Sequence, residues 1–266
     1  MKEISFEESK KNQIETLRII DKCCRTNGIN YSLSWGTLIG AIRHKGFIPW
    51  DDDVDLMMKR NDYEKFLSCF NEPNYELHYF KKGKFWHQFL TKVTDERTQV
   101  VFNYRKRGTF GLWVSIFPID NVPDVGLEEW KKKLHRRAML FRLRTSIWRS
   151  DTSFARNMLK MLFKTLLFPF PSYKLGLSVE SLLKENNDKK TKTVCLWDGG
   201  RGVTAFWYAP SEQFDKYIET EFEGGQFMVI SEYDQFLRDY YGDYMQLPPI
   251  EQRVPSHEYK AFFKNE

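Results

Sequence analysis

Residues 48–58, IPWDDDVDLMM, constrain the fold of this chain more than any other stretch. They place Asp51, Asp52, Asp53 and Asp55 within five positions, directly before apolar residues that are typical of a buried strand. Side chains alternate between the two faces of a strand, so Asp53 and Asp55 are expected to share one face. Two carboxylates that reach one point repel each other, and a cation between them would offset that repulsion.

Three interpretations of this acidic cluster are open. A solvated acidic turn requires no chemistry. A calcium loop could use Asp51, Asp53 and Asp55, but its sixth and twelfth positions hold Leu56 and Asp62 in place of the Gly and Glu that such loops need. A two-metal catalytic site with Mg²⁺ or Mn²⁺ suits two carboxylates that project from one rigid strand. We favour the third interpretation.

The surrounding segments predict an alternation of helices and short strands. A capping box at Ser5 and Glu8 predicts the start of a first helix, which Gly28 closes. A strand over 29–35, a helix over 37–44 and a strand over 54–58 should follow. A further helix is expected from an Asn61 cap, strands are expected at 75–80, 88–93, 98–102, 112–117 and 224–230, and helices are expected over 127–187 and 231–241.

This order favours an α+β fold with a strand-bearing first half and a helical addition in the second half. We expect residues 1–125 to form the catalytic core and residues 126–266 to form the helical addition and C-terminal segment, packed as one unit with the core. Gly36 and Thr37 stand where a strand ends and a helix begins, a junction that directs backbone N–H groups toward a phosphate.

The combination of Gly-Thr, a short helix and a strand with two spaced acids resembles the nucleotidyltransferase fold. The stretch GTLIGAIRHKGFIPWDDDVDLMM is similar to the hallmark of the LicD family of phosphorylcholine transferases, to which the fukutin-related transferases are related. Similarity continues in LWVSIFPIDNVP, EFEGGQF and YGDYMQLPPIEQRVPSH, so the resemblance runs from about Ser34 to His257. It implies a mixed, nucleotidyltransferase-like β-sheet flanked by helices.

The resemblance implies that Asp53 and Asp55 bind metal ions that bridge the pyrophosphate of a CDP-linked donor. The family places a third acid directly before an Ile-Phe-Pro stretch, but this chain has Ser115 there. Either Asp120 supplies the third ligand or general base, or the site uses a different metal arrangement. Asp120 could equally be a turn residue, and Asp95 is an outside candidate together with its neighbour Glu96.

Other residues of the family stretches are candidates for substrate contacts. Asp51 and Asp52 either orient ligands or are turn residues. Because choline is a quaternary ammonium ion, aromatic faces suit it. The candidate binding residues are Gly36, Thr37, Arg43 and His44 for phosphate, Trp50 and Trp86 for choline, and Arg253 and His257 for phosphate or acceptor.

Between Lys131 and Lys164, eleven Lys or Arg residues accompany one acid, Asp151, although the whole chain carries only +5. Basic residues alternate with Leu, Met and Phe over 131–168, which predicts either a peripheral contact with an anionic membrane or a basic-faced helix pair packed on the core. A nucleic-acid partner is disfavoured, because neither a helix-turn-helix nor an RNA-binding signature accompanies the basic residues.

No secretory signal and no membrane-spanning apolar run are visible in the sequence, and its four cysteines follow no ligand or disulfide pattern. We expect a cytoplasmic protein with reduced cysteines, in contact with the inner face of the membrane if the basic segment binds it. The expected activity is transfer of phosphocholine from CDP-choline to a sugar hydroxyl of a lipid-linked teichoic acid or lipopolysaccharide precursor. The alternatives are another CDP-activated donor, such as CDP-ribitol or CDP-glycerol, and a weakly catalytic homologue that binds glycan or membrane.

Overall fold

The computed structural model describes residues 2–80, 88–102, 110–146, 152–197, 206–255 and 257–264. Contacts divide the chain into two compact units, each built from segments that are distant in sequence. The first unit comprises Met1–His78, Thr91–Pro118 and Glu212–Glu266, and the second comprises Tyr79–Leu90 and Ile119–Ser211. Units defined by contacts need not fold independently, so a domain boundary near residue 125 stays a prediction.

The first unit starts with a long helix whose two ends are specified by the sequence. In α1 (Phe6–Asn27), Ser5 Oγ accepts a hydrogen bond from the Glu8 backbone N–H, and the Glu8 side chain accepts one from the Ser5 backbone N–H. The helix ends at Gly28, whose φ of 58° is the left-handed conformation that glycine adopts at low cost. The predicted start and end of this helix are therefore confirmed.

The segment around the acidic cluster folds as strand, helix, strand and helix. β2 (Ser32–Leu33) is followed by α2 (Trp35–His44), and β3 (Val54–Lys59) pairs antiparallel with β2. α3 (Arg60–Cys69) starts directly after β3, one residue before Asn61. The prediction of an Asn61 cap is wrong, because the chain turns from strand into helix without a connecting residue.

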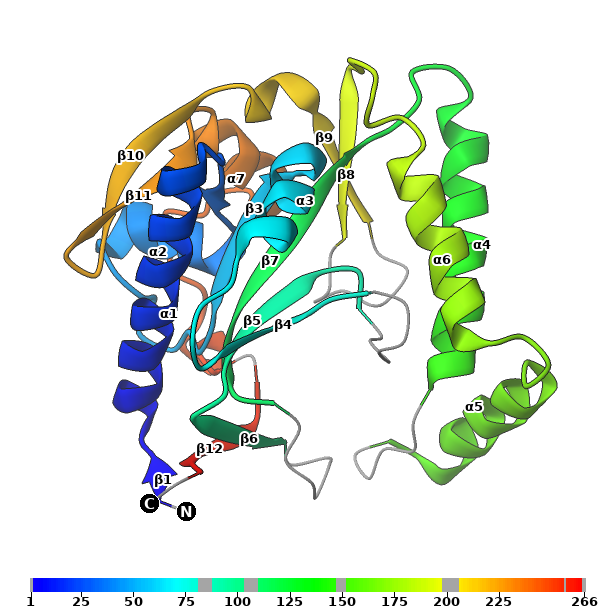
Figure 1. Cartoon of the computed structure of the whole chain (residues 1–266), viewed down its shortest axis with the longest axis horizontal. Helices are drawn as coiled ribbons and strands as arrows, with labels where there is room; N and C mark the ends of the chain where they lie inside the picture. Colours follow the sequence, from blue (N-terminus) through cyan, green and yellow to red (C-terminus); the bar gives the residue numbers. More distant parts are fainter. Residues whose placement is uncertain are drawn as a thin grey trace. The chain divides into compact units, whose positions relative to one another are not determined.

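The central sheet of the first unit has the strand order β2-β3-β7-β5-β4, so a strand from the middle of the chain lies beside β3 (Figure 1). β5 pairs antiparallel with both β4 and β7. A second sheet has the order β1-β12-β6, which brings the two ends of the chain together. The strands are β4 (Tyr75–His78), β5 (Thr91–Asp95), β7 (Leu112–Asn121), β1 (Glu3–Ile4), β12 (Tyr259–Phe263) and β6 (Thr98–Phe102).

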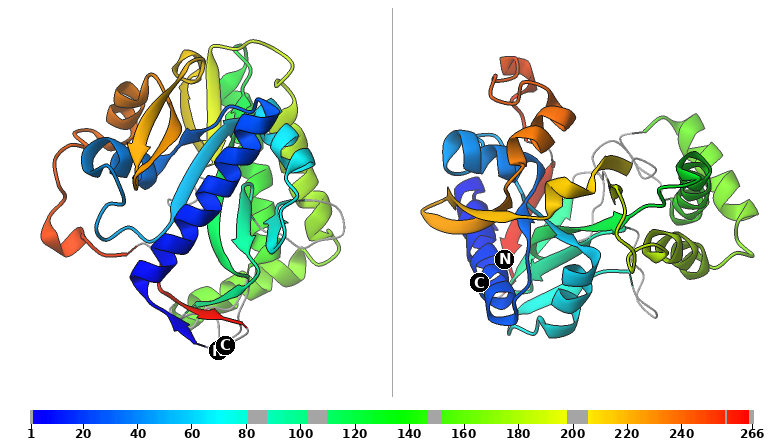
Figure 2. Two further views of the ribbon diagram at one scale, coloured as in Figure 1. Left: turned by 60° about the vertical axis from the view of Figure 1, so that its left-hand side comes forward. Right: turned by 90° about the horizontal axis from the view of Figure 1, so that it is seen from above.

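The rest of the first unit comes from the C-terminal part of the chain. The hairpin of β10 (Tyr217–Phe222) and β11 (Gly225–Ile230) packs on β2 and α2 (Figure 2). Helix α7 (Tyr233–Tyr241) also contacts α2. Two 3-10 turns, η1 (Ser211–Phe214) and η2 (Ile250–Gln252), complete the elements. The start of α2 is thus buried by residues far from it in sequence.

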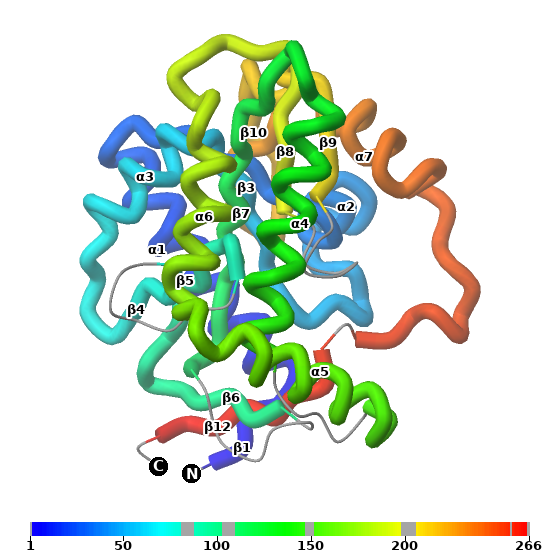
Figure 3. The backbone as a smooth tube through the Cα atoms, turned by 90° about the vertical axis from the view of Figure 1, so that its right-hand side faces the viewer, coloured from blue at the N-terminus to red at the C-terminus, as the bar shows by residue number. Residues whose placement is uncertain are grey.

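The second unit combines three helices with the end of β7 and two further strands. The helices are α4 (Leu127–Thr145), α5 (Phe154–Leu166) and α6 (Ser172–Lys184), and both α5 and α6 contact α4 (Figure 3). Ile119–Asn121 of β7 pair with β8 (Thr193–Trp197), which pairs with β9 (Phe206–Pro210). An aromatic cluster of Phe80, Phe89, Phe141 and Trp197 fills this unit.

The α+β class with a mixed sheet and flanking helices is confirmed. The second half is nevertheless not simply helical, since it also contributes β8 to β12. β10 and β11 form a local hairpin, and β11 matches the strand expected over 224–230, whereas β12 pairs with the distant strands β1 and β6. Among the described residues no helix is both long and apolar enough to cross a membrane. All four cysteines are free, as expected.

Candidate active site

The acidic strand is fastened to the motif that precedes it by two hydrogen bonds. The Asp55 backbone N–H donates to Thr37 Oγ at 2.9 Å, and the Asp55 carbonyl accepts from the Ser34 backbone N–H at 2.9 Å. Thr37 is 2% exposed and lies in the first turn of α2. Ser34 and Thr37 therefore fix the backbone of Asp55 at the start of the acidic strand. A phosphate contact by Gly36 and Thr37 stays a prediction.

Asp51 lies against the first turn of α2. A Cβ atom built on Gly36 would come within 2.6 Å of Asp51 Oδ2, so only glycine leaves room for this carboxylate. A helix N-terminus carries partial positive charge and unpaired N–H groups, which favour an anion. Asp51 is thereby held in place and is not a freely solvated turn residue.

The carboxylates of Asp51, Asp53 and Asp55 influence one another. Burial raises the pKa of Asp55 well above its usual range, and the neighbouring charges of Asp53 and Asp51 raise it further. Burial likewise raises the pKa of Asp51, and the charges of Asp53 and Asp52 add to this. Burial also raises the pKa of Asp53, although His257 opposes the shift. The three carboxylates therefore lie close together, and their ionised forms are disfavoured by burial and by neighbouring negative charges.

Two residues on neighbouring strands face these acids, and the sequence analysis found only one of them. Ser115 on β7 hydrogen-bonds through its side chain to Asp55, so the position expected to carry a third acid does point into the site. Lys92 on β5 lies opposite Ser115 in the antiparallel register. It is only 6% exposed.

Lys92 is a cation held among carboxylates and an aromatic ring. Burial lowers the pKa of Lys92 to about 8, against the opposite pull of Asp53 and Asp55. Its Nζ atom lies 3.7 Å from the Trp113 ring centroid, within the range of a cation–π contact. The signal available in the sequence was a lysine inside the strand expected over 88–93, and the structure shows that all five residues of β5 are buried.

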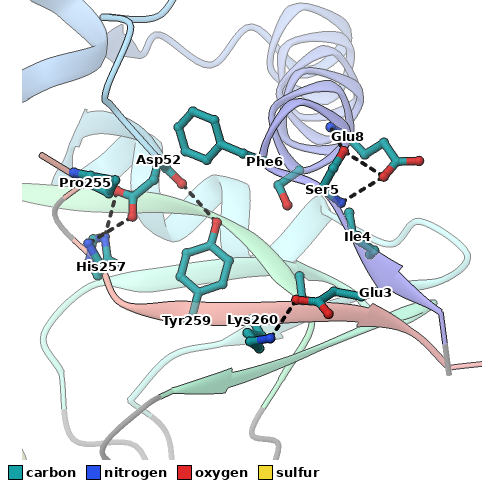
Figure 4. A pocket seen from close by; sticks show the side chains of 12 residues that line it. Glu3, Ile4, Ser5, Phe6, Glu8, Asp52, Pro255, His257, Tyr259 and Lys260 are labelled. Atoms are coloured by element: carbon teal, nitrogen blue, oxygen red, sulfur yellow. Dashed lines mark hydrogen bonds and ion pairs between the residues drawn. The ribbon is translucent and has the colours of Figure 1, made fainter.

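Asp52 connects the acidic cluster to the C-terminal segment (Figure 4). One carboxylate oxygen accepts from the His257 backbone N–H at 2.9 Å, and the other lies 3.2 Å from His257 Nδ1. His257 Nδ1 is also 3.6 Å from Asp53 Oδ2. Burial alone would lower the pKa of His257, but Asp52 and Asp53 outweigh it and raise the pKa. The predicted site residues Asp53 and His257, 204 positions apart, are thus brought together.

A pocket of about 480 Å³ borders this pair. Its lining combines the start of α1, the residues around His257 and the start of β12, including Phe6, Glu8 and Tyr259 (Figure 4). The Tyr259 hydroxyl donates to the Asp52 carbonyl at 3.2 Å. The pocket gives a small group access to the Asp52 and His257 side of the acids.

Arg43, Trp50 and Arg253 form a second predicted group. Arg43 Nη1 donates to the carbonyls of Tyr244 and Gln246, which fastens the C-terminal segment to α2. Burial lowers the pKa of Arg43, and the charge of Arg253 lowers it further. The Arg253 guanidinium carbon lies 5.5 Å from the Trp50 ring centroid, so Trp50 already serves as a surface for a cation.

The remaining candidates have partners of their own. Arg43 Nε is 3.4 Å from His44 Nδ1, and burial lowers the pKa of His44. Asp120 belongs to the second unit, and its Oδ1 accepts from Asn187 Nδ2 at 2.7 Å. Asp95 is fully buried and bonded to Arg97. Trp86 lies outside the described residues.

The donor set fits a hard divalent cation. Among the described residues, Asp52, Asp53 and His257 offer ligand atoms that all lie within 4.8 Å of one another, and Asp55 adds a further carboxylate next to this partly buried group. Oxygen ligands suit Mg²⁺ and Mn²⁺. Mutual repulsion among the acids would be relieved by such an ion. A second group, formed by Glu76, His78 and Glu96, has similar spacing but contains none of the acids of residues 51–55.

A mixed sheet that presents paired acids beside a helix N-terminus defines a phosphotransferase of the nucleotidyltransferase fold. Residues 28–173 match the family model described as LicD/FKTN/FKRP, nucleotidyltransferase domain. The lipopolysaccharide cholinephosphotransferase LicD of Haemophilus influenzae is 32% identical over 98% of this chain and 99% of its own length. The chain belongs to the LicD/FKTN/FKRP family.

Shorter matches include two ribitol phosphate transferases and an uncharacterised protein. The ribitol 5-phosphate transferases FKRP of mouse and human are 48% identical over 42 residues, which is 16% of this chain and 8% of theirs. An uncharacterised protein of Rickettsia typhi is 38% identical over 83 residues, covering 30% of this chain and 24% of its own length. The predicted family is confirmed.

Proposed function

We propose that this enzyme transfers phosphocholine from CDP-choline to a sugar hydroxyl of a cell-surface glycan precursor and releases CMP. Two observations support the proposal. The carboxylates of Asp51, Asp53 and Asp55 converge beside the start of α2, and the near-full-length relative is a cholinephosphotransferase. The convergence of the three acids carries the argument for chemistry, because burying neighbouring carboxylates has an electrostatic cost that the fold alone does not require.

In the proposed reaction the acceptor hydroxyl oxygen forms a bond to the choline-bearing phosphorus. The bond from that phosphorus to the CMP oxygen breaks, and the hydroxyl proton passes to a base. Mg²⁺ or Mn²⁺, when bound, would neutralise charge on the pyrophosphate. Asp53 and Asp55 would hold the ions, with Asp52 and His257 as further donors.

Four further residues either hold the acids in place or supply positive charge for the donor. Thr37 fixes the start of β3, so that Asp55 keeps its direction. Lys92 supplies a fixed positive charge next to the acids, which supports binding of a negatively charged donor. Arg43 and Arg253, close enough for one charge to lower the pKa of the other, are suited to a phosphate group.

Choline requires a surface that attracts a cation without hydrogen bonds. Trp50 is the proposed contact, and its ring already faces the Arg253 guanidinium. A bound trimethylammonium group would replace that guanidinium. Trp86 remains a second proposal from the sequence.

Asp120 stays the sequence-based proposal for a third ligand or general base. Its observed partner, Asn187, supports a structural role in the second unit instead. Ser115 at the expected acid position favours a site with Asp52 and His257 as additional ligands, since both lie next to Asp53.

One experiment tests which CDP-linked donor the enzyme uses and whether a sugar hydroxyl can be the acceptor. The purified chain is mixed with Mn²⁺, a panel of alkyl hexosides and either CDP-choline, CDP-ribitol or CDP-glycerol, and release of CMP is measured. We expect CDP-choline to be used at least about tenfold faster than the others, a preference of about 1.4 kcal/mol. A faster reaction with CDP-ribitol would move the enzyme to the ribitol branch. No release from any donor would favour a glycan-binding homologue.

A further inference from the structure

Helix α5 (Phe154–Leu166) has its apolar side turned away from the protein. Phe154 is 70% exposed, Leu159 is 54%, Leu162 is 55% and Leu166 is 63%. The exposed side chains on the helix and just after it are here called the α5 apolar face, and they are Phe154, Met158, Leu159, Leu162, Phe163, Leu166, Phe168 and Phe170. A surface helix of a water-soluble domain shows the opposite arrangement.

Polar residues occupy the side of α5 that packs on the protein. Asn157 is 1% exposed, and its Nδ2 donates to the Thr152 carbonyl at 3.2 Å. Lys164 Nζ donates to the carbonyl of Ser146, just after the end of α4, at 2.8 Å. The helix is therefore held by polar contacts, and its orientation exposes the residues that water disfavours.

The charged side chains of α5 and of the residues that follow it are all basic. Residues 152–170 contain Arg156, Lys160 and Lys164 and no Asp or Glu. Arg144, near the end of α4, adds a cation beside the face, with its Nε donating to the Phe170 carbonyl at 3.1 Å and its guanidinium carbon 5.7 Å from the Phe168 ring. An occupant of this face must tolerate apolar contact and carry negative charge.

We propose that the α5 apolar face lies in the interface of an anionic membrane. Leu, Met and Phe on one side, bordered by Lys and Arg, are the features of a helix that lies in the headgroup region. At 13 residues α5 is shorter than the roughly 20 residues needed to span a bilayer, so it lies on the surface. This narrows the membrane contact expected over 131–168 to one helix and the phenylalanines after it.

Flotation with vesicles tests this proposal on the full chain. Vesicles of phosphatidylglycerol and phosphatidylcholine should carry the protein to the top of the gradient at low salt, and pure phosphatidylcholine vesicles should carry about tenfold less. The double variant Leu159→Glu/Leu162→Glu should lose about tenfold or more of the binding, with an unchanged melting temperature because both side chains are exposed. Arg156→Gln should weaken binding mainly at low salt.

The matched control is Ile250→Glu/Val254→Glu, which makes the same charge change at two side chains that are 76% and 60% exposed elsewhere. It should bind vesicles like the parent. The proposal would be overturned if both double variants bound vesicles equally well. It would also be overturned if the parent did not float with anionic vesicles at low salt. A third outcome is that the parent self-associates but does not bind vesicles, and that Leu159→Glu/Leu162→Glu abolishes the self-association. This outcome would assign the α5 apolar face to contact with a second copy of the chain.

Discussion

Lys92 on β5 lies directly opposite Ser115 on β7, and both side chains face the acids at the start of β3. A buried ammonium group thus occupies the neighbourhood in which the family pattern predicts a third carboxylate. Lys92 and a divalent cation both offset the negative charge of Asp53 and Asp55, so the lysine ammonium group should weaken binding of the divalent cation. The role of Lys92 can therefore be measured through metal affinity and turnover.

Lys92→Met should lower turnover about tenfold to a hundredfold, because the site loses a fixed charge next to the transferred phosphate. Mn²⁺ should bind equally well or more tightly, since a like charge is removed. Folding should be little changed, as Met has a similar length and can keep the contact with Trp113. Calorimetric Mn²⁺ titration and CMP release measure the two effects. Lys92→Arg is the charge-retaining control, and unchanged turnover in Lys92→Met would contradict the role.

Asp55→Asn should reduce transfer about 10³-fold or more, because a ligand of the proposed metal site is lost. The metal-free variant should melt at the same temperature as the parent or higher, because burial and neighbouring acids raise the pKa of Asp55 and its ionised form is unfavourable. Asp53→Asn should behave alike. Asp188→Asn, on an exposed acid, is the control. Ordinary CMP release by the Asp53/Asp55 double variant would refute the metal site.

Gly36→Ala should impair catalysis more than folding. The new Cβ would meet the flexible end of Asp51, 2.6 Å away, so the carboxylate rather than the backbone has to move. We expect at least a tenfold loss of turnover, because small displacements at such sites are costly. Gly28→Ala is the converse control: it has open space but a φ of 58°, so it should cost about 1 kcal/mol of stability and leave turnover unchanged.

Asp120→Asn distinguishes a role of Asp120 as a metal ligand from a structural role as the partner of Asn187. We expect a loss of about 1–3 kcal/mol of stability, because a buried carboxylate that accepts from Asn187 is replaced by an amide. Mn²⁺ affinity should not change. Denaturant unfolding and Mn²⁺ titration provide the two measurements. Lower Mn²⁺ affinity at unchanged stability would make Asp120 the third ligand.

Asp95→Asn should destabilise the protein by about 1–3 kcal/mol at pH 7. Burial alone would raise the pKa of Asp95, but hydrogen bonds from Arg97 and Asn12 outweigh it and lower the pKa below its usual value. A lowered pKa gives stability that is present above the ordinary Asp value of about 4 and is lost as pH falls through the folded value. The gap between parent and variant should therefore narrow below about pH 4. If the difference in free energy of unfolding between parent and variant were constant from pH 7 to pH 3, the Asp95–Arg97 ion pair could not be its source.

Local patterns in the sequence were sufficient for many features of the fold. The capping box at Ser5, the glycine at position 28, the strand after Asp53 and the helix over 233–241 all depend on residues within a few positions of one another. Strands β8, β9, β10 and β12 were not predicted, and two of them, β8 and β12, pair with strands far away in the chain.

The acidic pair, its family and the apolar residues that direct it can be read from the residues alone, because spacing on one strand fixes which side chains share a face. Which groups surround the pair depends on how distant segments fold together. Lys92 and Ser115 reach it through the register of β5 and β7, and His257 reaches it through the C-terminal segment. Those neighbours depend on pairing and packing between distant segments, which no local spacing specifies. For the same reason, only the folded chain showed that α5 turns its apolar side outward.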